Sequence, residues 1–330
     1  MSMLIGHVAE LWRYPVKSLG GGQVDHAELG PRGMRGDRLW AVRDLERDVT
    51  ASARQLPVLL TATARYVAPV SMDSGPGNVP EVEITFPDGA VVSSSDDGVH
   101  TKLSELAGRD VRLTALPPAE DTSLHKLTRA ERSETMSPKF LRAAFGVSDD
   151  EKLPDLSMVR VSDMVNFTRY STPPGMFVDL APVHVLSTTS LATIGAEIGS
   201  DVDVRRFRPN VLLALDNPDD ELPESHWTGA RVVLGEAVLD VMMPTVRCVV
   251  PSRAQPGFEV DRRITKAVAV RAQRCLGVYC GVDSSGTVRV GDDVSLRSAN
   301  AGRKVFTDAA RRAKRLTFGL VTGATERFSR

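Results

Sequence analysis

The sequence predicts an α+β protein that is mostly β with some helices, organised as two β-barrel-like domains. Short β-rich runs recur between turn residues, and their regular spacing is typical of barrels or sandwiches. One pair has a hairpin signature, because Val82–Phe86 and Ala90–Val92 flank the turn-forming Pro87-Asp88-Gly89. Helix signals are fewer, so helices are expected to support the strands.

Further strands are expected where β-branched and aromatic residues gather between Gly, Pro, Asp and Ser. A turn over Asp283–Gly286 precedes the last of these runs. The expected strands are Val8–Tyr14, Arg38–Arg43, Asn210–Leu215, Arg231–Leu234, Ala237–Met243 and Thr287–Val290.

Two helices are indicated by the residues at their ends. Ser137 is a typical N-cap, Pro138 suits the first helical position, and Gly146 suits a stop, so a helix is predicted over 138–145. A second helix is predicted from the capping residues at Ser187 to an end near Gly195 or Gly199.

The composition disfavours several classes of function. The 330 residues hold 41 Lys and Arg against 42 Asp and Glu, so no global charge favours nucleic acid, and aromatic residues are few. We expect no membrane span, since no run approaches about 18 apolar residues, and no signal peptide. Three cysteines make no disulfide framework, so a cytoplasmic location is expected.

The chain divides into four segments. Residues 1–116 and 175–297 carry the strand signals and are expected to form the two domains, joined by a polar, helix-leaning connection over 117–174. Residues 298–330 form a basic tail with eight Lys and Arg against two acids. Within it, 308–316 has the pattern of a basic helix. That helix is either a solvated surface element or a contact for an acidic protein or a membrane surface.

Cys248 is the residue most suited to chemistry. It follows Arg247 after the apolar run Ala237–Met243. A thiolate is a soft, strong metal ligand, and a neighbouring cation favours its formation. A free cysteine on its own is most often buried and inert, however, so the surrounding motifs must decide.

Four motifs occur in order along the chain. They are Leu11-Trp12-Arg13-Tyr14-Pro15-Val16-Lys17-Ser18 with Gly36–Val42, Arg206–Val211, Arg247-Cys248, and Leu276-Gly277-Val278-Tyr279 with Gly286–Val294. The set resembles MOSC-domain proteins that carry an N-terminal MOSC β-barrel domain. These are relatives of the molybdenum cofactor sulfurase C-terminal domain and of the mitochondrial amidoxime reducing component. The resemblance covers roughly residues 5–115 and 175–296, and it makes 1–116 the N-terminal MOSC β-barrel domain and 175–297 the MOSC domain.

The resemblance implies a molybdenum cofactor, Mo-molybdopterin, in a cleft between the domains. The chemistry of the matching residues agrees, since Lys17 offers a point charge, and Arg38 and Arg208 offer planar forks for phosphate oxygens. Cys248 is the expected metal ligand, and Cys248 and Arg247 are the expected catalytic residues. By resemblance, the cofactor-binding residues are Lys17, Ser18, Arg38, Arg208, Asn210, Arg247, Cys248 and Tyr279.

Most of these assignments have a structural alternative. Lys17 and Ser18 can form a solvated turn, Arg38 can pair with Asp37, Arg208 can cap a barrel rim, Asn210 can follow Pro209 in a turn, and Tyr279 can be a core aromatic. Cys275 and Cys280 lack the second ligand pair of a zinc site and are expected to be small apolar fillers.

The resemblance implies a molybdenum-dependent oxidoreductase that reduces small N-hydroxylated compounds such as amidoximes, hydroxamates or hydroxylamines. The tail holds no cysteine for an iron–sulfur cluster, so a separate donor, ferredoxin- or cytochrome b5-like, is expected to supply electrons. The alternative is a non-catalytic carrier of molybdenum cofactor or sulfur. A third possibility is a MOSC scaffold that holds another anionic ligand.

Two departures from the amidoxime-reducing relatives concern hydroxyl groups. Val246 stands where a small hydroxyl residue commonly precedes the Arg-Cys pair, with Thr245 one step earlier. Leu180-Ala181-Pro182 stands where those relatives have a Thr-Ser pair. The sequence therefore predicts fewer hydroxyl donors to the cofactor than those relatives offer.

Overall fold

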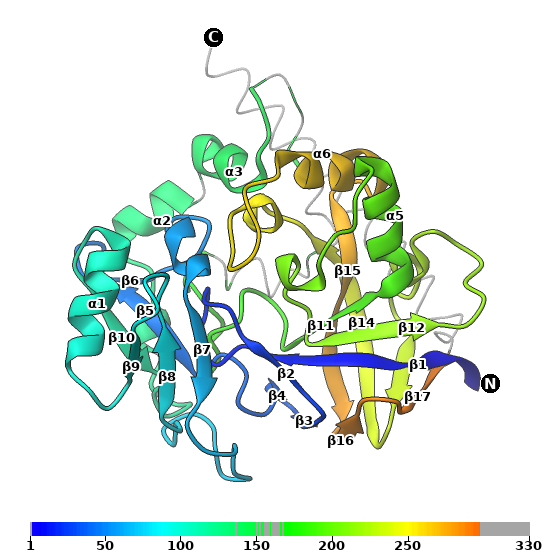
Figure 1. The fold of residues 1–330 in the computed structure, drawn as a ribbon, viewed down its shortest axis with the longest axis horizontal. Helices are drawn as coiled ribbons and strands as arrows, with labels where there is room; N and C mark the ends of the chain where they lie inside the picture. The colour runs from blue at the N-terminus through cyan, green and yellow to red at the C-terminus, as the bar shows by residue number, and fades with distance from the viewer. Residues whose placement is uncertain are drawn as a thin grey trace.

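The fold is mixed α+β and mostly strands, as predicted. The computed structural model describes residues 2–297, except 136, 150, 152, 155–158, 160–165 and 167. The basic tail over 298–330 and its predicted helix lie outside the described residues. Figure 1 shows a barrel on one side, small sheets on the other, and helices α2 (Arg129–Thr135) and α3 (Pro138–Phe145) over the junction.

A closed seven-stranded barrel forms the larger half. Its strands follow the order β12-β11-β15-β14-β13-β17-β1, and β1 closes it by pairing with both β17 and β12. Only β11 and β12 pair in parallel within this ring of described strands. The strands are β1 (Ser2–Arg13), β11 (Val183–Ser187), β12 (Val211–Leu215), β13 (Arg231–Leu234), β14 (Ala237–Val246), β15 (Cys275–Ser284) and β17 (Asp293–Arg297).

Every second side chain along the strands points into the barrel and fills it. Along β14 buried and half-buried residues alternate over all ten positions, so Leu239, Val241 and their alternates face inward. Cys280 of β15 is fully buried in this core, where the sequence predicted an apolar filler, and burial raises the pKa of its thiol. The barrel interior is therefore a packed core, and any site must lie at its mouth.

The smaller half carries two three-stranded sheets around a second core. Its predicted hairpin is present, with β8 paired to β9, and α1 packs on this core through Val99 and Leu103. The sheets are β5 (Trp40–Asp44), β6 (Val49–Thr50) and β10 (Val111–Ala115), and β7 (Thr63–Tyr66), β8 (Val82–Thr85) and β9 (Val91–Ser93), with α1 over Gly98–Ala107.

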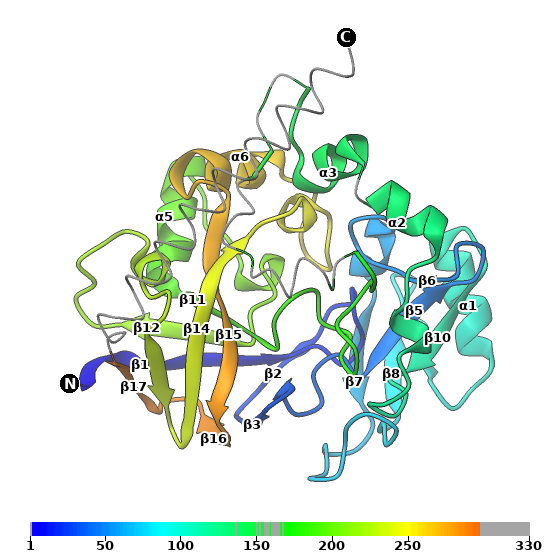
Figure 2. The same ribbon diagram turned by 180° about the vertical axis from the view of Figure 1, so that it is seen from behind.

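The two halves exchange strands. β1 from the N-terminus completes the barrel, and β16 from the C-terminal part pairs with β3 of the N-terminal part (Figure 2). The division of the chain near residues 116 and 175 stays a prediction, and these strands cross it. The remaining strands are β2 (Gly22–Val24), β3 (His26–Gly30), β4 (Gly33–Met34) and β16 (Gly286–Arg289).

Both predicted helices are present with their predicted caps. Ser137 Oγ accepts from the Phe140 N–H at 3.1 Å, and Ser187 Oγ accepts from the Ser190 N–H at 3.1 Å. Gly146 and Gly199 end the helices in the left-handed region. These two helices are α3 (Pro138–Phe145) and α5 (Thr188–Ile198), and the other described helices besides α1 are α2 (Arg129–Thr135) and α6 (Arg262–Arg271). Short 3₁₀ turns lie at Pro57–Thr61, Ser123–His125, Val204–Arg206, Pro223–His226 and Val250–Ser252. Among the described helices, none has the length and apolar character to cross a membrane.

His125 ties the two ends of the connection together. Its Nε2 accepts from the Gly175 N–H at 3.2 Å, so that nitrogen carries no proton, and its Nδ1 lies 2.7 Å from Thr172 Oγ1. The ring is fully buried against Phe177. Burial lowers the pKa of His125 to about 4.

His125 predicts a pH-dependent stability. Below an ordinary pKa of 6.5 the unfolded chain binds a proton that the folded protein refuses until about pH 4. The free energy of unfolding therefore falls as the pH drops through that window. Urea unfolding of wild type and His125→Gln across the window measures this, and the variant should show the shallower slope. Equal slopes would contradict the role given to His125.

Gly277 on β15 predicts a second stability effect. Its φ is +78°, and a Cβ there would lie 2.5 Å from His184 Nε2 and 2.7 Å from the Val185 carbonyl oxygen. Gly277→Ala should lower the free energy of unfolding by about 2–4 kcal/mol. Gly281→Ala on the same strand is the control, because its Cβ would meet only Met242 Sδ, at 3.7 Å. If denaturant titrations show the same loss of unfolding free energy in both variants, the close contact at Gly277 is not its cause.

Candidate functional site

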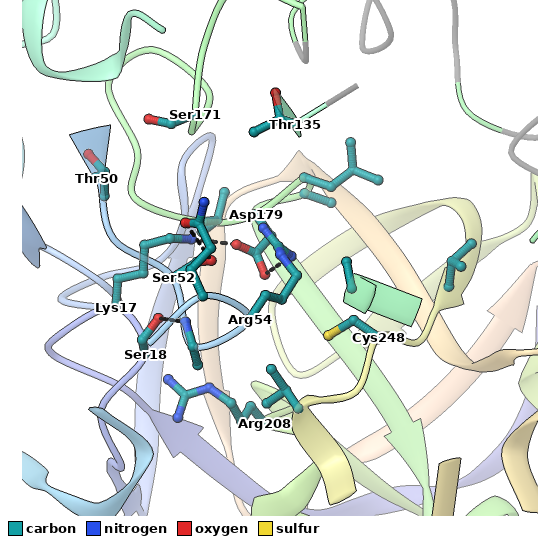
Figure 3. Close-up of a pocket in the computed structure, with 18 of the residues that line it drawn as sticks. Lys17, Ser18, Thr50, Ser52, Arg54, Thr135, Ser171, Asp179, Arg208 and Cys248 are labelled. Carbon is teal, nitrogen blue, oxygen red and sulfur yellow. Dashed lines mark hydrogen bonds and ion pairs between the residues drawn. The ribbon is translucent and has the colours of Figure 1, made fainter. Parts of the chain in front are cut away.

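A cavity of about 330 Å³ lies where the barrel mouth meets the smaller half. Residues of α2 and α3, both from the connection, also line it. All eight residues singled out from the sequence line this one cavity: Lys17, Ser18, Arg38, Arg208, Asn210, Arg247, Cys248 and Tyr279. Figure 3 shows Lys17, Ser18, Arg208 and Cys248 around it.

Three of these residues have left-handed backbones although none is glycine. The φ angles are 71° at Ser18, 52° at Arg38 and 55° at Arg208. Such a conformation costs on the order of 1–3 kcal/mol per residue and persists where the surroundings fix it. Here Arg38 N–H donates to the Tyr14 carbonyl at 2.7 Å, and Lys17 N–H donates to the Trp40 carbonyl at 2.8 Å. The backbone strain therefore occurs at residues whose side chains line the cavity.

The Tyr14 ring underlies two of the cationic side chains. It is 1% exposed, and the guanidinium carbons of Arg208 and Arg38 lie 4.3 and 5.0 Å from its centroid. Its hydroxyl is buried without a hydrogen-bond partner, and burial raises its pKa. A ring face attracts cations, so Tyr14 holds together two groups that repel each other.

The guanidinium groups of Arg38 and Arg208 both bind the protein, and Arg38 Nη2 donates to the Arg208 carbonyl at 3.4 Å. Arg38 pairs with Asp37, the ion pair that the sequence left as an alternative, and it lines the cavity as well. Arg208 donates from Nη1 to the Leu19 carbonyl at 2.6 Å, while its buried Nη2 has no partner. Burial and the Arg38 charge lower the pKa of Arg208 to about 10. Of the two, Arg208 thus keeps a free buried donor that an anion could bind.

Asp179 and Arg54 belong to the site and were missed from the sequence. Lys17 Nζ, which is buried, forms an ion pair with Asp179, and Arg54 Nη1 lies 3.3 Å from Asp179 Oδ2. Asp179 raises the pKa of Arg54, and Cys248 adds to this effect, so the guanidinium lies beside both. Asp179 directly precedes the Leu180-Ala181-Pro182 stretch, which was the available signal.

Arg247 supports the cavity wall next to Cys248. Its Nη2 donates to the Phe207 carbonyl at 2.8 Å, and its Nη1 lies 3.3 Å from His184 Nε2. Its Nε is buried and unpartnered. Burial and the Arg247 charge hold the pKa of His184 well below its usual range, so the ring is neutral.

Cys248 is a free, half-buried thiol at the cavity wall. Tyr279 lies across β15 from the barrel core, edge-on to His184 at 5.7 Å. Burial, with Asp179, raises the pKa of Tyr279 to about 12, so its hydroxyl keeps its proton at neutral pH. A thiol and a protonated hydroxyl thus lie in one cavity with several cations.

Asn210 and Ser18 also bind the protein itself. Asn210 Oδ1 accepts from the His184 N–H at 3.2 Å, and its Nδ2 donates to the Trp12 carbonyl at 3.4 Å, which joins β1 to β11. Ser18 Oγ accepts from the Ala53 N–H at 2.9 Å and so fixes the loop that carries Arg54. Both residues therefore shape the cavity whatever it holds.

The positions where the sequence predicted missing hydroxyl donors line the cavity. Leu180, Ala181 and Val246 all line it and present apolar surface. Thr245 is buried, and its hydroxyl has no partner. The wall on this side is thus more apolar than the relatives' motifs suggest.

The barrel, the smaller β half and a cavity that joins a free cysteine to a cationic cluster define a class of protein. Residues 173–295 match the MOSC domain, and residues 5–110 match the MOSC N-terminal beta barrel domain. The chain is therefore a MOSC-domain protein with the N-terminal MOSC β-barrel domain.

Within this class the chain is a distant relative of the mitochondrial amidoxime reducing components. It is 23% identical over 308 residues to component 2 of Bos taurus, and the alignment covers 88% of this chain and 83% of that protein. It is 24% identical over 324 residues to component 1 of Mus musculus, covering 88% and 82%. The solved YuaD protein of Bacillus subtilis aligns over 91% of this chain and 99% of its own, at 12% identity and a TM-score of 0.42.

The Tyr14 platform predicts a defect in anion binding. Tyr14→Leu should weaken binding of inorganic phosphate to the cofactor-free protein about tenfold, because the two guanidinium groups lose a cation–π partner. Tyr14→Phe keeps the ring and should bind like wild type. Calorimetric titration measures both, with circular dichroism as the folding control. Equal affinity in the Leu and Phe variants would show that the ring does not position the cations.

Proposed function

We propose that this protein is a molybdenum-cofactor oxidoreductase that reduces N-hydroxylated compounds. The supporting observation is the cavity, which gathers a free thiol, a set of fixed cations and an apolar wall. The amidoxime-reducing names of the relatives give the reaction class. Amidoximes, hydroxamates and hydroxylamines are the expected substrates.

The residues fit the cofactor. Among the described residues that line the cavity, five are cationic and two are carboxylates. The unpartnered Arg208 Nη2 and Arg247 Nε are buried donors, and leaving such groups without an acceptor is costly. A pterin phosphate supplies acceptor oxygens and negative charge, and a dithiolene-bound metal leaves room for one soft protein ligand.

Each side chain then has a definite part. Lys17, Arg38 and Arg208 would hold the phosphate, and Cys248 would be the protein ligand to the metal. When bound, the cofactor supplies the oxygen-atom and electron-pair chemistry that no side chain can perform. Arg54 and Arg247 stabilise negative charge beside the thiolate.

Reductive cleavage of an N–O bond also needs protons. Conversion of an N-hydroxyl group to N–H consumes an electron pair and protons and releases water. The Tyr279 hydroxyl is protonated at neutral pH, and burial lowers the pKa of the Lys17 ammonium, although Asp179 opposes that shift. Tyr279 is therefore the proposed proton donor, whereas Lys17 is assigned to the phosphate. Electrons would come from a separate ferredoxin- or cytochrome b5-like protein.

The second candidate is a carrier of molybdenum cofactor or sulfur. The apolar Leu180, Ala181 and Val246 favour it, because fewer hydroxyl contacts imply weaker retention. Turnover separates the two functions. If protein that is saturated with the cofactor reduces no amidoxime when a strong artificial electron donor is present, the protein is a carrier.

Cys248→Ala is predicted to abolish benzamidoxime reduction while the protein still folds and retains pterin. Arg208→Ala should instead lower pterin retention by about 10- to 100-fold, the equivalent of one lost charge-assisted contact. Activity with reduced methyl viologen, together with fluorometric pterin content, distinguishes the two defects. Full activity in Cys248→Ala would remove the basis of the proposal.

A further inference from the structure

Helix α3 forms an apolar wall of the cavity next to Cys248. Phe140, Leu141 and Ala144 line the cavity from one face of this helix. The wall is fixed in place, because Val249, the residue after Cys248, donates its N–H to the Ala144 carbonyl at 3.0 Å. Anything bound beside Cys248 therefore contacts α3.

Other apolar side chains extend this wall. Leu127, Val159 and Val178 line the same cavity and are at most 8% exposed. Leu127 and Val159 come from the connection, and Val178 follows its C-terminal end. Together with α3 they form a surface suited to an apolar group.

The carboxylates at the cavity are already neutralised. Arg47 binds both oxygens of Glu131, at 2.7 and 3.1 Å. Asp179 is held by Lys17 and Arg54. Among the described lining residues no carboxylate remains for a cationic substrate. The neutral hydroxyls of Thr135 and Ser171, which donate to the Glu131 and His125 carbonyls, lie at the end away from Cys248 and Arg208 (Figure 3).

We propose that α3 is the specificity wall of this protein and selects N-hydroxylated substrates with a neutral, apolar body. Aryl amidoximes and aryl hydroxylamines bind with the ring against Leu141 and the N–O group toward Cys248. Cationic N-hydroxyguanidines, such as N-hydroxyarginine, are disfavoured because they meet fixed cations and, among the described lining residues, no unpaired carboxylate. This inference rests on the proposed function and narrows its substrate class.

Three substrates of different character test the wall. Benzamidoxime is neutral and aromatic, hydroxyurea is neutral and small, and N-hydroxy-L-arginine carries a guanidine-type cation. With reduced methyl viologen as donor, kcat/KM for benzamidoxime should exceed that for either other compound by about 10- to 100-fold, the range that burial of an aromatic ring supports.

A matched pair of variants locates the effect on α3. Leu141→Asn should lower kcat/KM for benzamidoxime about tenfold and change that for hydroxyurea less than about twofold. Ala143→Asn is the control, because Ala143 is exposed on the same helix. Thermal unfolding of both variants checks that α3 remains folded.

Binding without turnover gives an independent readout. Ligand-observed NMR should detect benzamidoxime on the cofactor-free wild type and on Ala143→Asn, with a weaker signal on Leu141→Asn. Turnover without a preference for benzamidoxime would contradict the proposal that α3 sets specificity. A preference that is unchanged in Leu141→Asn would contradict it as well. If no substrate is turned over, the proposed function fails, and the wall is then judged by the NMR comparison alone.

Discussion

The pairing of β1 with β12 is the constraint on which the site depends. Its register places Leu11 opposite Val211, and Trp12 N–H donates to the Asn210 carbonyl at 2.9 Å. Because the strands are antiparallel, the residues after β1 must meet the residues before β12. Tyr14 therefore lies beneath Arg208, and Lys17 follows at the cavity. Strand β1 closes the barrel and places the Lys17-Ser18 motif that follows it at the barrel mouth.

Closing the barrel in this way concentrates like charges in one place. Arg38 and Arg208 share the Tyr14 ring, and Lys17 and Arg54 share Asp179. Left-handed backbones and unpartnered donors add to the cost. An anionic ligand offsets these costs by supplying charge and acceptors together. The cationic side of the cavity thus suits the phosphate of the proposed cofactor, and α3 adds an apolar wall.

Local signals in the sequence predicted local features correctly. Ser137 and Gly146 framed α3, and Pro87-Asp88-Gly89 marked the β8–β9 hairpin, because caps and tight turns depend on neighbouring residues. Barrel closure by β1 could not be predicted, since it pairs residues some 200 positions apart. Arg54 and Asp179 were missed for the same reason, because each is a single charge in a loop that only the fold brings to Lys17.

The content of the cavity is the central claim, and direct analysis of the purified protein tests it. Wild-type protein from a host that makes molybdenum cofactor should carry molybdenum and phosphorylated pterin in equimolar amounts. X-ray absorption at the molybdenum edge should show one sulfur ligand beyond the dithiolene pair. Folded protein that holds pterin-free cavities and no molybdenum, even after incubation with released cofactor, would contradict the account.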